Sequence, residues 1–443
     1  MQFNSLTFLF NFLPLFLAVY YIFPVKWRNF ILVIGSLIFY GLGCGSNFWW
    51  LKLLAALTAV TYMMGIVLQR FRKDFLLGAE LLVLFACLIF FKRYNGGALL
   101  PVGLSFYLFQ MAAYLMDIYR QKISAEMHFI RYAAQCTMFP KLLCGPLMEP
   151  AELQEQVRQR RFDGSKFHRG LQELIAGLGM KVLLANRLGG LWSQAAVFGY
   201  ESISVPFAWM ALLAYALRLY FDFFGYSLMG VGVGRMLGFQ LPENFLEPYS
   251  AKTVGDFYRR WHATLGRWFR EYIYIPLGGN RKGMARTLLN LCVVWLLTGL
   301  WHGNGGNYLI WAGFLCLMII LERLFMGKIL NRSRVFCHVY LVFVILLSWV
   351  PFAIGDWNRM RVFLGRLFGV GGIGLNPQDY IVWGQRYLPL LLTGIFFATP
   401  IPRRLWGKIR QHPAFDIALF ALFWAAVYFI ATAAQDPFLY FQY

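Results

Sequence analysis

Two of the six histidines in this 443-residue chain stand where an imidazole could transfer a proton. His302 ends the apolar run Leu288–His302 and Gly303 follows it, so we expect a helix that stops there with Gly303 as its cap. Burial disfavours the charged imidazolium, whereas the negative end of a helix dipole favours it. A histidine in that balance accepts a proton near neutral pH, which is general-base chemistry. The local context leaves a core histidine bonded to a backbone carbonyl equally open.

His262 lies in a stretch, residues 256–272, whose pattern predicts one amphipathic helix at the membrane interface. On a helical wheel, one face collects aromatic and apolar side chains and the other collects guanidinium groups. The apolar face holds Phe257, Trp261, Leu265, Trp268, Phe269 and Tyr272, and the basic face holds Arg259, Arg260, Arg267 and Arg270. Such a helix anchors a chain in lipid, and its arginines could also meet the phosphates of a substrate in an active site.

Asp222 is a carboxylate inside an apolar run and therefore needs a partner. Arg218 precedes it by one helical turn, so we expect a structural ion pair between these two side chains. No nucleophile motif, phosphate-binding loop or zinc-protease motif occurs. The seven cysteines are scattered without CxxC spacing, so neither a disulfide framework nor a metal site is indicated.

Composition identifies the class of protein. Apolar residues make up 59% of the chain and charged residues 14%, which excludes a soluble enzyme, a disordered chain and a small disulfide scaffold. The net charge of +21 is typical of lysine and arginine in cytoplasmic loops that meet anionic lipid rather than nucleic acid. Part of this charge could also serve an anionic substrate or carrier.

The pattern predicts an all-α polytopic membrane protein with about 11–12 transmembrane helices and a single domain, residues 1–443. Leu6–Phe23 reads as a retained first span, and Lys26 and Arg28 behind it place the N-terminus outside. Lys92 and Arg93 fall on the wrong side by simple counting, so either a segment is re-entrant or the rule is broken there. Residues 119–170 are basic and mixed, and we expect them to form a cytoplasmic layer of amphipathic helices.

Several motifs, in this order and spacing, closely resemble the membrane-bound O-acyltransferase (MBOAT) family. They are Phe3–Pro14, Leu100–Phe106, Phe139–Leu142, Gly145–Pro146, Tyr220–Asp222, Leu241–Asn244, Tyr258–His262, Trp268–Asn280, Gly299–Gly303 and Asp436–Gln442. The two histidines, His262 and His302, match the paired positions of that family. Ile275–Gly279 resembles the alginate O-acetyltransferase (AlgI) branch, and residues 251–285 would then hold an interfacial active-site helix and its PLGGN loop. Arg218 and Leu228 depart from that branch, which commonly has Gln and Asp there.

The resemblance implies acyl transfer in a ring of tilted helices around a central tunnel. The donor would be acetyl-CoA or another acyl thioester entering from the cytoplasm, with no metal cofactor. His302 would be the general base, and His262 would position a substrate or assist proton transfer. The substrate-binding residues would be Trp301, Trp261, Arg260, Asp222 and Asn244.

The resemblance also implies a setting in a bacterial plasma membrane, crossed many times. No extracytoplasmic domain is large enough to bind a polymer alone, so we expect a partner acetyltransferase and a polysaccharide or cell-wall acceptor outside, together with membrane lipids and no nucleic acid. The runner-up within the enzymes is a D-alanyl transferase of teichoic acid synthesis (DltB-like) that uses an acylated carrier protein. A transporter of lipid-linked sugar would need internal symmetry, and no repeat is visible. A scaffold for a polysaccharide synthase is the third alternative.

Overall fold

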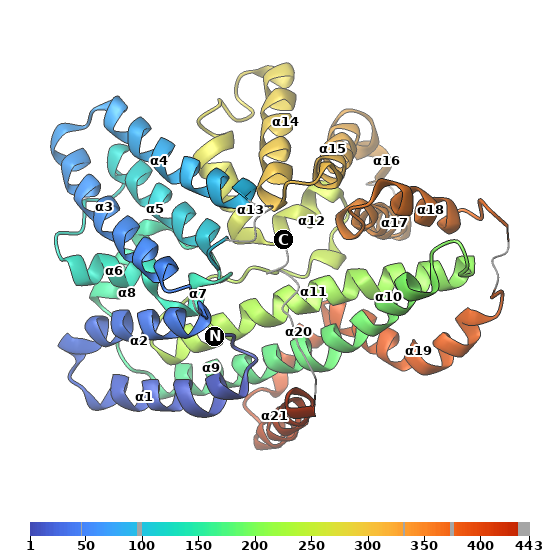
Figure 1. Ribbon diagram of the computed structural model, residues 1–443, viewed down its shortest axis with the longest axis horizontal. Helices are drawn as coiled ribbons and strands as arrows, with labels where there is room; N and C mark the ends of the chain where they lie inside the picture. The colour runs from blue at the N-terminus through green and yellow to red at the C-terminus, as the bar shows by residue number, and fades with distance from the viewer. Residues whose placement is uncertain (46, 95–99, 331–332, 373–375, 433–443) are drawn as a thin grey trace. The chain divides into compact units, whose positions relative to one another are not determined.

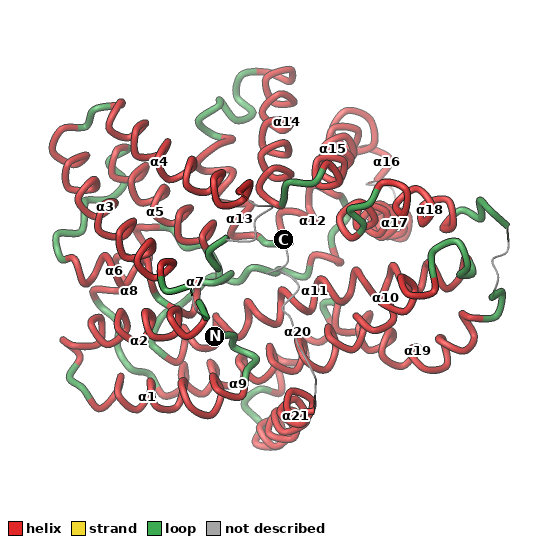
Figure 2. Tube along the Cα trace, in the orientation of Figure 1, coloured by secondary structure: helices red, strands yellow, loops and turns green. Residues whose placement is uncertain are grey.

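The structure is a computed structural model that describes residues 1–45, 47–94, 100–330, 333–372 and 376–432. These residues form helices joined by loops and contain no strand, only an isolated antiparallel bridge between Phe245 and Trp261 (Figure 2). The all-α prediction is therefore confirmed. The tail motif Asp436–Gln442 lies outside the described residues. So do the first two residues of the apolar run 98–118, which the sequence also predicts to be a span.

The described residues fall into two compact units, whose helices are labelled in Figure 1. The first comprises residues 1–178, 225–243 and 421–432, and the second comprises residues 179–224 and 244–420. Two helices, α11 (Val205–Met236) and α21 (Pro413–Thr432), contribute residues to both. The two candidate histidines belong to the second unit.

The helices of the first unit are α1 (Leu13–Ile22), α2 (Arg28–Gly43), α3 (Trp49–Phe71), α4 (Asp74–Arg93), α5 (Leu104–Tyr119), α6 (Phe129–Thr137), α7 (Phe139–Leu142), α8 (Pro150–Arg158) and α9 (Gly164–Gly179), with short helical turns at Thr7–Phe12 and Val25–Trp27. The helices of the second unit are α10 (Asn186–Phe198), α12 (Val254–Arg260), α13 (Ala263–Phe269), α14 (Gly283–His302), α15 (Gly306–Leu321), α16 (Gly327–Leu330), α17 (Arg334–Ala353), α18 (Trp357–Leu367), α19 (Asp379–Ala398) and α20 (Ile401–Ile409). Its π or 3₁₀ segments are Met180–Ala185, Pro248–Ser250, Arg270–Tyr274 and Glu322–Met326.

Ten helices among the described residues are long and apolar enough to cross a membrane. They are Val25–Gly43, Trp49–Phe71, Asp74–Arg93, Gly164–Phe198, Val205–Met236, Gly283–His302, Gly306–Met326, Arg334–Ala353, Asp379–Ala398 and Pro413–Thr432. The sequence predicted two more. Of these, Thr7–Ile22 is a shorter apolar helix, and α5 has only 16 residues, nearly all of them buried by other helices. Apolar composition in α5 therefore serves protein packing, which hydropathy alone does not distinguish from lipid contact.

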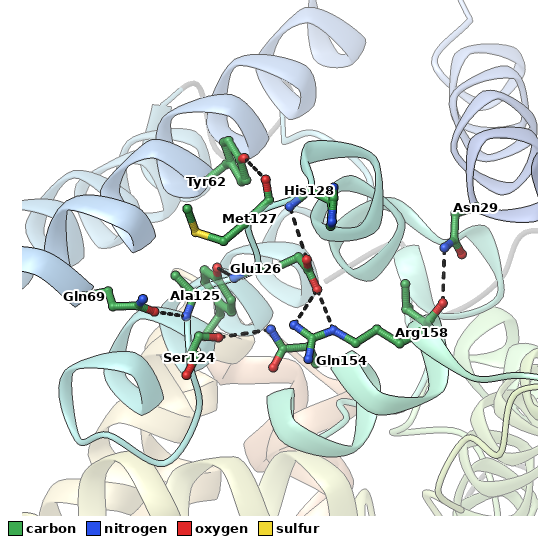
Figure 3. A network of polar contacts seen from close by, with 12 residues as sticks. Asn29, Tyr62, Gln69, Ser124, Ala125, Glu126, Met127, His128, Gln154 and Arg158 are labelled. Atoms are coloured by element: carbon green, nitrogen blue, oxygen red, sulfur yellow. Dashed lines mark hydrogen bonds and ion pairs between the residues drawn. The ribbon is translucent and has the colours of Figure 1, made fainter. Parts of the chain in front are cut away.

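The basic segment 119–170 is helical in short pieces, as expected, but much of it is packed inside the first unit. A network of polar contacts ties its loop to neighbouring helices (Figure 3). The buried Glu126 carboxylate accepts bonds from Arg158 at 2.9 Å, and the Tyr62 hydroxyl donates to the Met127 carbonyl at 2.8 Å. Gln154 donates to the Ser124 carbonyl at 3.0 Å. Several of its charges thus hold this segment in place within the protein, and its cytoplasmic placement stays a prediction.

Candidate active site

His262 lies at a break between two short helices, and the prediction of one continuous helix through residues 256–272 is wrong. Helix α12 ends at Arg260 and α13 begins at Ala263. Between them Trp261 is extended, and His262 adopts the left-handed conformation, with φ 46° and ψ 49°. A side chain with a Cβ pays about 1–2 kcal/mol to adopt this conformation, and it persists only where the surroundings hold it.

The backbone of residues 244–246 stabilises this interruption of the helix. The Leu246 amide donates to the Arg260 carbonyl at 3.0 Å, and the Ala263 amide donates to the Asn244 carbonyl at 2.9 Å. These bonds flank the bridge between Phe245 and Trp261. The Arg260 carbonyl and the Ala263 amide would otherwise lack the hydrogen bonds that a continuous helix supplies. The bonds to residues 244 and 246 replace them, so the helix can be interrupted at His262 without leaving these backbone groups unsatisfied.

The helical wheel of residues 256–272 nevertheless separated buried apolar side chains from exposed arginines, as the following residues illustrate. Phe257, Leu265 and Trp268 are buried, whereas Arg259 and Arg267 are exposed. The segregation survives because both short helices keep their apolar sides toward the second unit's core. At the start of α12, the Thr253 hydroxyl caps the helix by accepting from the Asp256 amide at 3.0 Å.

The His262 side chain is only 5% exposed. Its Nδ1 lies 3.2 Å from Oδ1 of Asn244, and the Thr264 hydroxyl donates to the same oxygen. The Phe223 ring contacts the imidazole edge-on, with 4.7 Å between ring centres. Burial lowers the pKa of His262 from 6.5 to about 3, so the ring is neutral at physiological pH.

His302 is the last residue of α14, and Gly303 caps the helix as the sequence predicted. A Cβ at position 303 would lie 2.3 Å from the Tyr308 ring, so only glycine allows this approach. The half-buried imidazole is surrounded by aromatic rings. Its centre lies 4.6 Å from Trp301, 4.8 Å from Trp311 and 5.2 Å from Phe352.

Trp301 connects the two histidines. Its ring centre is 4.6 Å from that of His302 and 6.3 Å from that of His262. The fold therefore brings both imidazoles to one buried indole, although one ends α14 and the other lies between α12 and α13. A reacting group beside Trp301 would have two imidazoles near it.

The remaining predicted site residues divide into two sets. Asn244 and Trp301 contact His262 directly, and Trp261 precedes it and packs against Trp349, with 5.2 Å between ring centres. Arg260 faces the other way. Its guanidinium pairs with Asp256 at 3.0 Å and donates to the Ser250 hydroxyl at 3.0 Å.

Asp222 forms the expected buried ion pair, but the predicted partner is wrong. Lys181, not Arg218, supplies the ammonium group, 2.8 Å from the carboxylate, and both side chains are almost fully buried. Lys181 also donates to Asn186 at 2.7 Å. The neighbour of Asp222, Phe223, is the residue that contacts His262. The ion pair thus holds α11 at the level of the site.

The loop that contains Ile275–Gly279 is fastened to the helix that carries His302. Gly278 and Gly279 have φ of 108° and 55°, which glycine adopts without strain. From α14, Asn290 donates to the Gly279 carbonyl at 2.9 Å, and Arg286 donates to the Leu277 carbonyl at 3.0 Å.

Sequence reasoning missed several residues that position the site. Lys181 and Glu322 are ionisable side chains within apolar helices, which is the signal that could have identified them. Glu322 accepts from the Val254 and Gly255 amides at 2.6 and 3.1 Å and so holds the start of α12. Phe223 and Thr264 carry no such signal, because only the fold brings them to His262. Among the described residues, no group of three or more His, Cys, Asp or Glu side chains could hold a metal ion.

Comparison with known proteins gives a consistent result. The model of the MBOAT family, membrane-bound O-acyltransferases, matches residues 72–352. The probable alginate O-acetylase AlgI of Pseudomonas putida is 32% identical, with all of both chains covered. The corresponding protein of Pseudomonas aeruginosa is 34% identical over 80% of this chain and 72% of its own. The peptidoglycan O-acetyltransferase of Helicobacter pylori is 29% identical over 84% and 81% of the two chains.

Proposed function

The chain belongs to the membrane-bound O-acyltransferase family, and we propose that it moves an acetyl group from a cytoplasmic thioester across the membrane to O-acetylate an extracytoplasmic polymer. It is a multi-pass membrane enzyme with acyl transfer as its reaction. Family membership, identity to alginate O-acetylases over the full chain, and two imidazoles on one indole support the proposal. The acceptor is a polysaccharide or cell-wall hydroxyl, as in the relatives that act on alginate and peptidoglycan.

In this mechanism His302 is the general base. The oxygen of an attacking hydroxyl adds to the thioester carbonyl, a C–O bond forms and the C–S bond breaks. His302 takes the hydroxyl proton and returns it to the departing thiolate sulfur, so the reaction consumes no net proton. Base assistance of this kind contributes about 10²–10⁴ in rate. The aromatic side chains that pack around the half-buried His302 support this role.

The donor in this proposal is acetyl-CoA or another acyl thioester. His262 positions a substrate or assists proton transfer. We further propose a bacterial plasma-membrane location with the N-terminus outside, and an extracytoplasmic acetyltransferase partner that delivers the group to the polymer.

D-alanyl transfer is the alternative within the same family. The teichoic acid D-alanyltransferase of Bacillus subtilis is 33% identical over 23% of this chain and 27% of its own, and that of Lacticaseibacillus rhamnosus is 24% identical over 52% and 60%. The probable alginate O-acetylase of Pseudomonas putida is 32% identical over the full length of both chains. This difference in coverage favours the acetyl group.

The deciding experiment measures O-acyl esters in the cell envelope of a strain that carries His302→Ala, at membrane levels equal to wild type. Loss of acetyl esters is the expected result, and loss of alanyl esters would select the alternative donor. The matched control is His338→Ala in α17, because that imidazole bonds a carbonyl of its own helix at 2.6 Å. Unchanged esters in the His302 variant would refute the base assignment and favour a transporter or a scaffold.

A further inference from the structure

Asn244 bonds to the His262 region twice, through its side chain and through its backbone carbonyl. The Asn244 side-chain oxygen lies 3.2 Å from His262 Nδ1, while its backbone oxygen accepts from the Ala263 amide at 2.9 Å. We propose that Asn244 is a positioning residue that keeps the His262 proton on Nδ1 and thereby presents a lone pair at Nε2 to the substrate. This inference rests on the proposed acyl transfer and replaces the earlier expectation that Asn244 binds substrate.

The backbone fixes the distance between the two side chains. Residues 244–246 pair with residues 260–263 through two hydrogen bonds and the bridge between Phe245 and Trp261. His262 meets Asn244 in the left-handed conformation that interrupts the helix. Backbone outliers of this kind gather at functional sites, where strain serves to aim a side chain.

The chemistry of the two groups sets the tautomer. A neutral imidazole carries its proton on one nitrogen and a lone pair on the other. An amide oxygen can only accept, so Nδ1 facing it must carry the proton. In this arrangement the Thr264 hydroxyl donates to the same oxygen. The lone pair is then on Nε2.

The surroundings keep the ring neutral. Phe223 and Trp301 line it, and Asp222 and Arg260 on neighbouring elements are engaged in ion pairs with Lys181 and Asp256. His302 is a second titratable group beside Trp301. A neutral ring with its lone pair on Nε2 is a hydrogen-bond acceptor for an O–H or N–H of acceptor or donor. It can therefore orient the substrate while His302 removes the proton.

Two variants at position 244 test this role. Asn244→Asp keeps the shape and an acceptor oxygen, whereas Asn244→Leu keeps the volume and removes it. We expect Asn244→Leu to lower kcat for thioester-dependent acetyl transfer by about 10- to 100-fold, as for loss of a partner that orients a functional histidine. Asn244→Asp should recover most of this activity. If the amide instead donated to Nδ1, the aspartate would be as inactive as the leucine.

A measurement independent of activity accompanies the kinetics. The ¹⁵N signals of His262, assigned by comparison with His262→Asn, report which ring nitrogen carries the proton. We expect protonated Nδ1 in the wild type and in Asn244→Asp, and a shift toward protonated Nε2 in Asn244→Leu. A tautomer unchanged in Asn244→Leu would overturn the inference. A wild-type protein that consumes no acetyl thioester would refute the proposed function, while the spectra would still decide the tautomer.

Discussion

Acidification should destabilise this protein through His262, and the size of the effect follows from its burial. The pKa of His262 is lowered from 6.5 to about 3 in the folded protein because burial excludes the charged ring from water. Above 6.5 neither the folded nor the unfolded chain holds the proton. Between about pH 6.5 and pH 3 the unfolded chain binds a proton that the folded chain does not, so the free energy of unfolding falls as pH falls.

The magnitude is about 1.4 kcal/mol for each pH unit below 6.5. At about pH 5 the contribution of His262 is therefore a loss of roughly 2 kcal/mol relative to about pH 7.5. His262→Asn lacks a titratable ring, and asparagine tolerates the left-handed conformation. We expect the difference in unfolding free energy between wild type and this variant to change by that amount across the interval.

The assay is guanidinium-induced unfolding of both proteins in detergent, at matched ionic strength and several pH values. Other titrating groups are common to both proteins and cancel in the difference. His338→Asn controls for the loss of one histidine elsewhere in the second unit. A wild-type-minus-variant difference that stays constant with pH would refute the reasoning, since it would mean that folded and unfolded chains protonate position 262 alike.

Three further substitutions test the elements that support the site. Lys181→Met leaves Asp222 buried without its ion-pair partner, so the free energy of unfolding should fall by about 3–5 kcal/mol, and adding Asp222→Leu should restore most of it, as measured by denaturant unfolding. Gly303→Ala places a Cβ 2.3 Å from the Tyr308 ring and should displace the turn after His302, so acetyl transfer should drop while Gly313→Ala, with nothing within 4 Å, keeps wild-type activity. Equal activity in the two glycine variants would contradict the packing argument. Glu322→Gln weakens the carboxylate bonds to the first amides of α12 and should lower thermal stability by about 1–3 kcal/mol, and an unchanged melting temperature would contradict this role.

Much of the fold could be predicted because hydrophobic length is a local property. In the sequence, the apolar runs 48–68 and 335–354 each predict one spanning helix, and the structure has helices at Trp49–Phe71 and Arg334–Ala353. The same measure overcounts α5, where apolar side chains face other helices rather than lipid. Hydropathy indicates that a segment avoids water, but it does not indicate whether the segment packs against other helices or contacts lipid.

The site divides in the same way between local and distant causes. The stop at His302 could be predicted because Gly303 stands next to it in the sequence. The break at His262 could not, since neither proline nor glycine stands at or next to position 262. It arises from the pairing with residues 244–246, and helical periodicity does not record a competing long-range partner. The sequence correctly predicted that Asp222 pairs with a basic side chain, because an unpaired carboxylate is costly inside an apolar helix. It gave the wrong partner, since Arg218 is near in sequence whereas Lys181 is brought close by the fold.

The left-handed backbone at His262 also bears on how this protein would respond to selection for stability alone. Glycine at that position would relieve about 1–2 kcal/mol of conformational strain and remove a buried imidazole that disfavours folding in acid. A screen for heat- or acid-resistant variants that ignored acetyl transfer should therefore enrich replacements at position 262. A screen that also requires acetyl transfer should retain histidine at this position. The difference in unfolding free energy between the proteins from the two screens is then the stability that the enzyme gives up for its reaction.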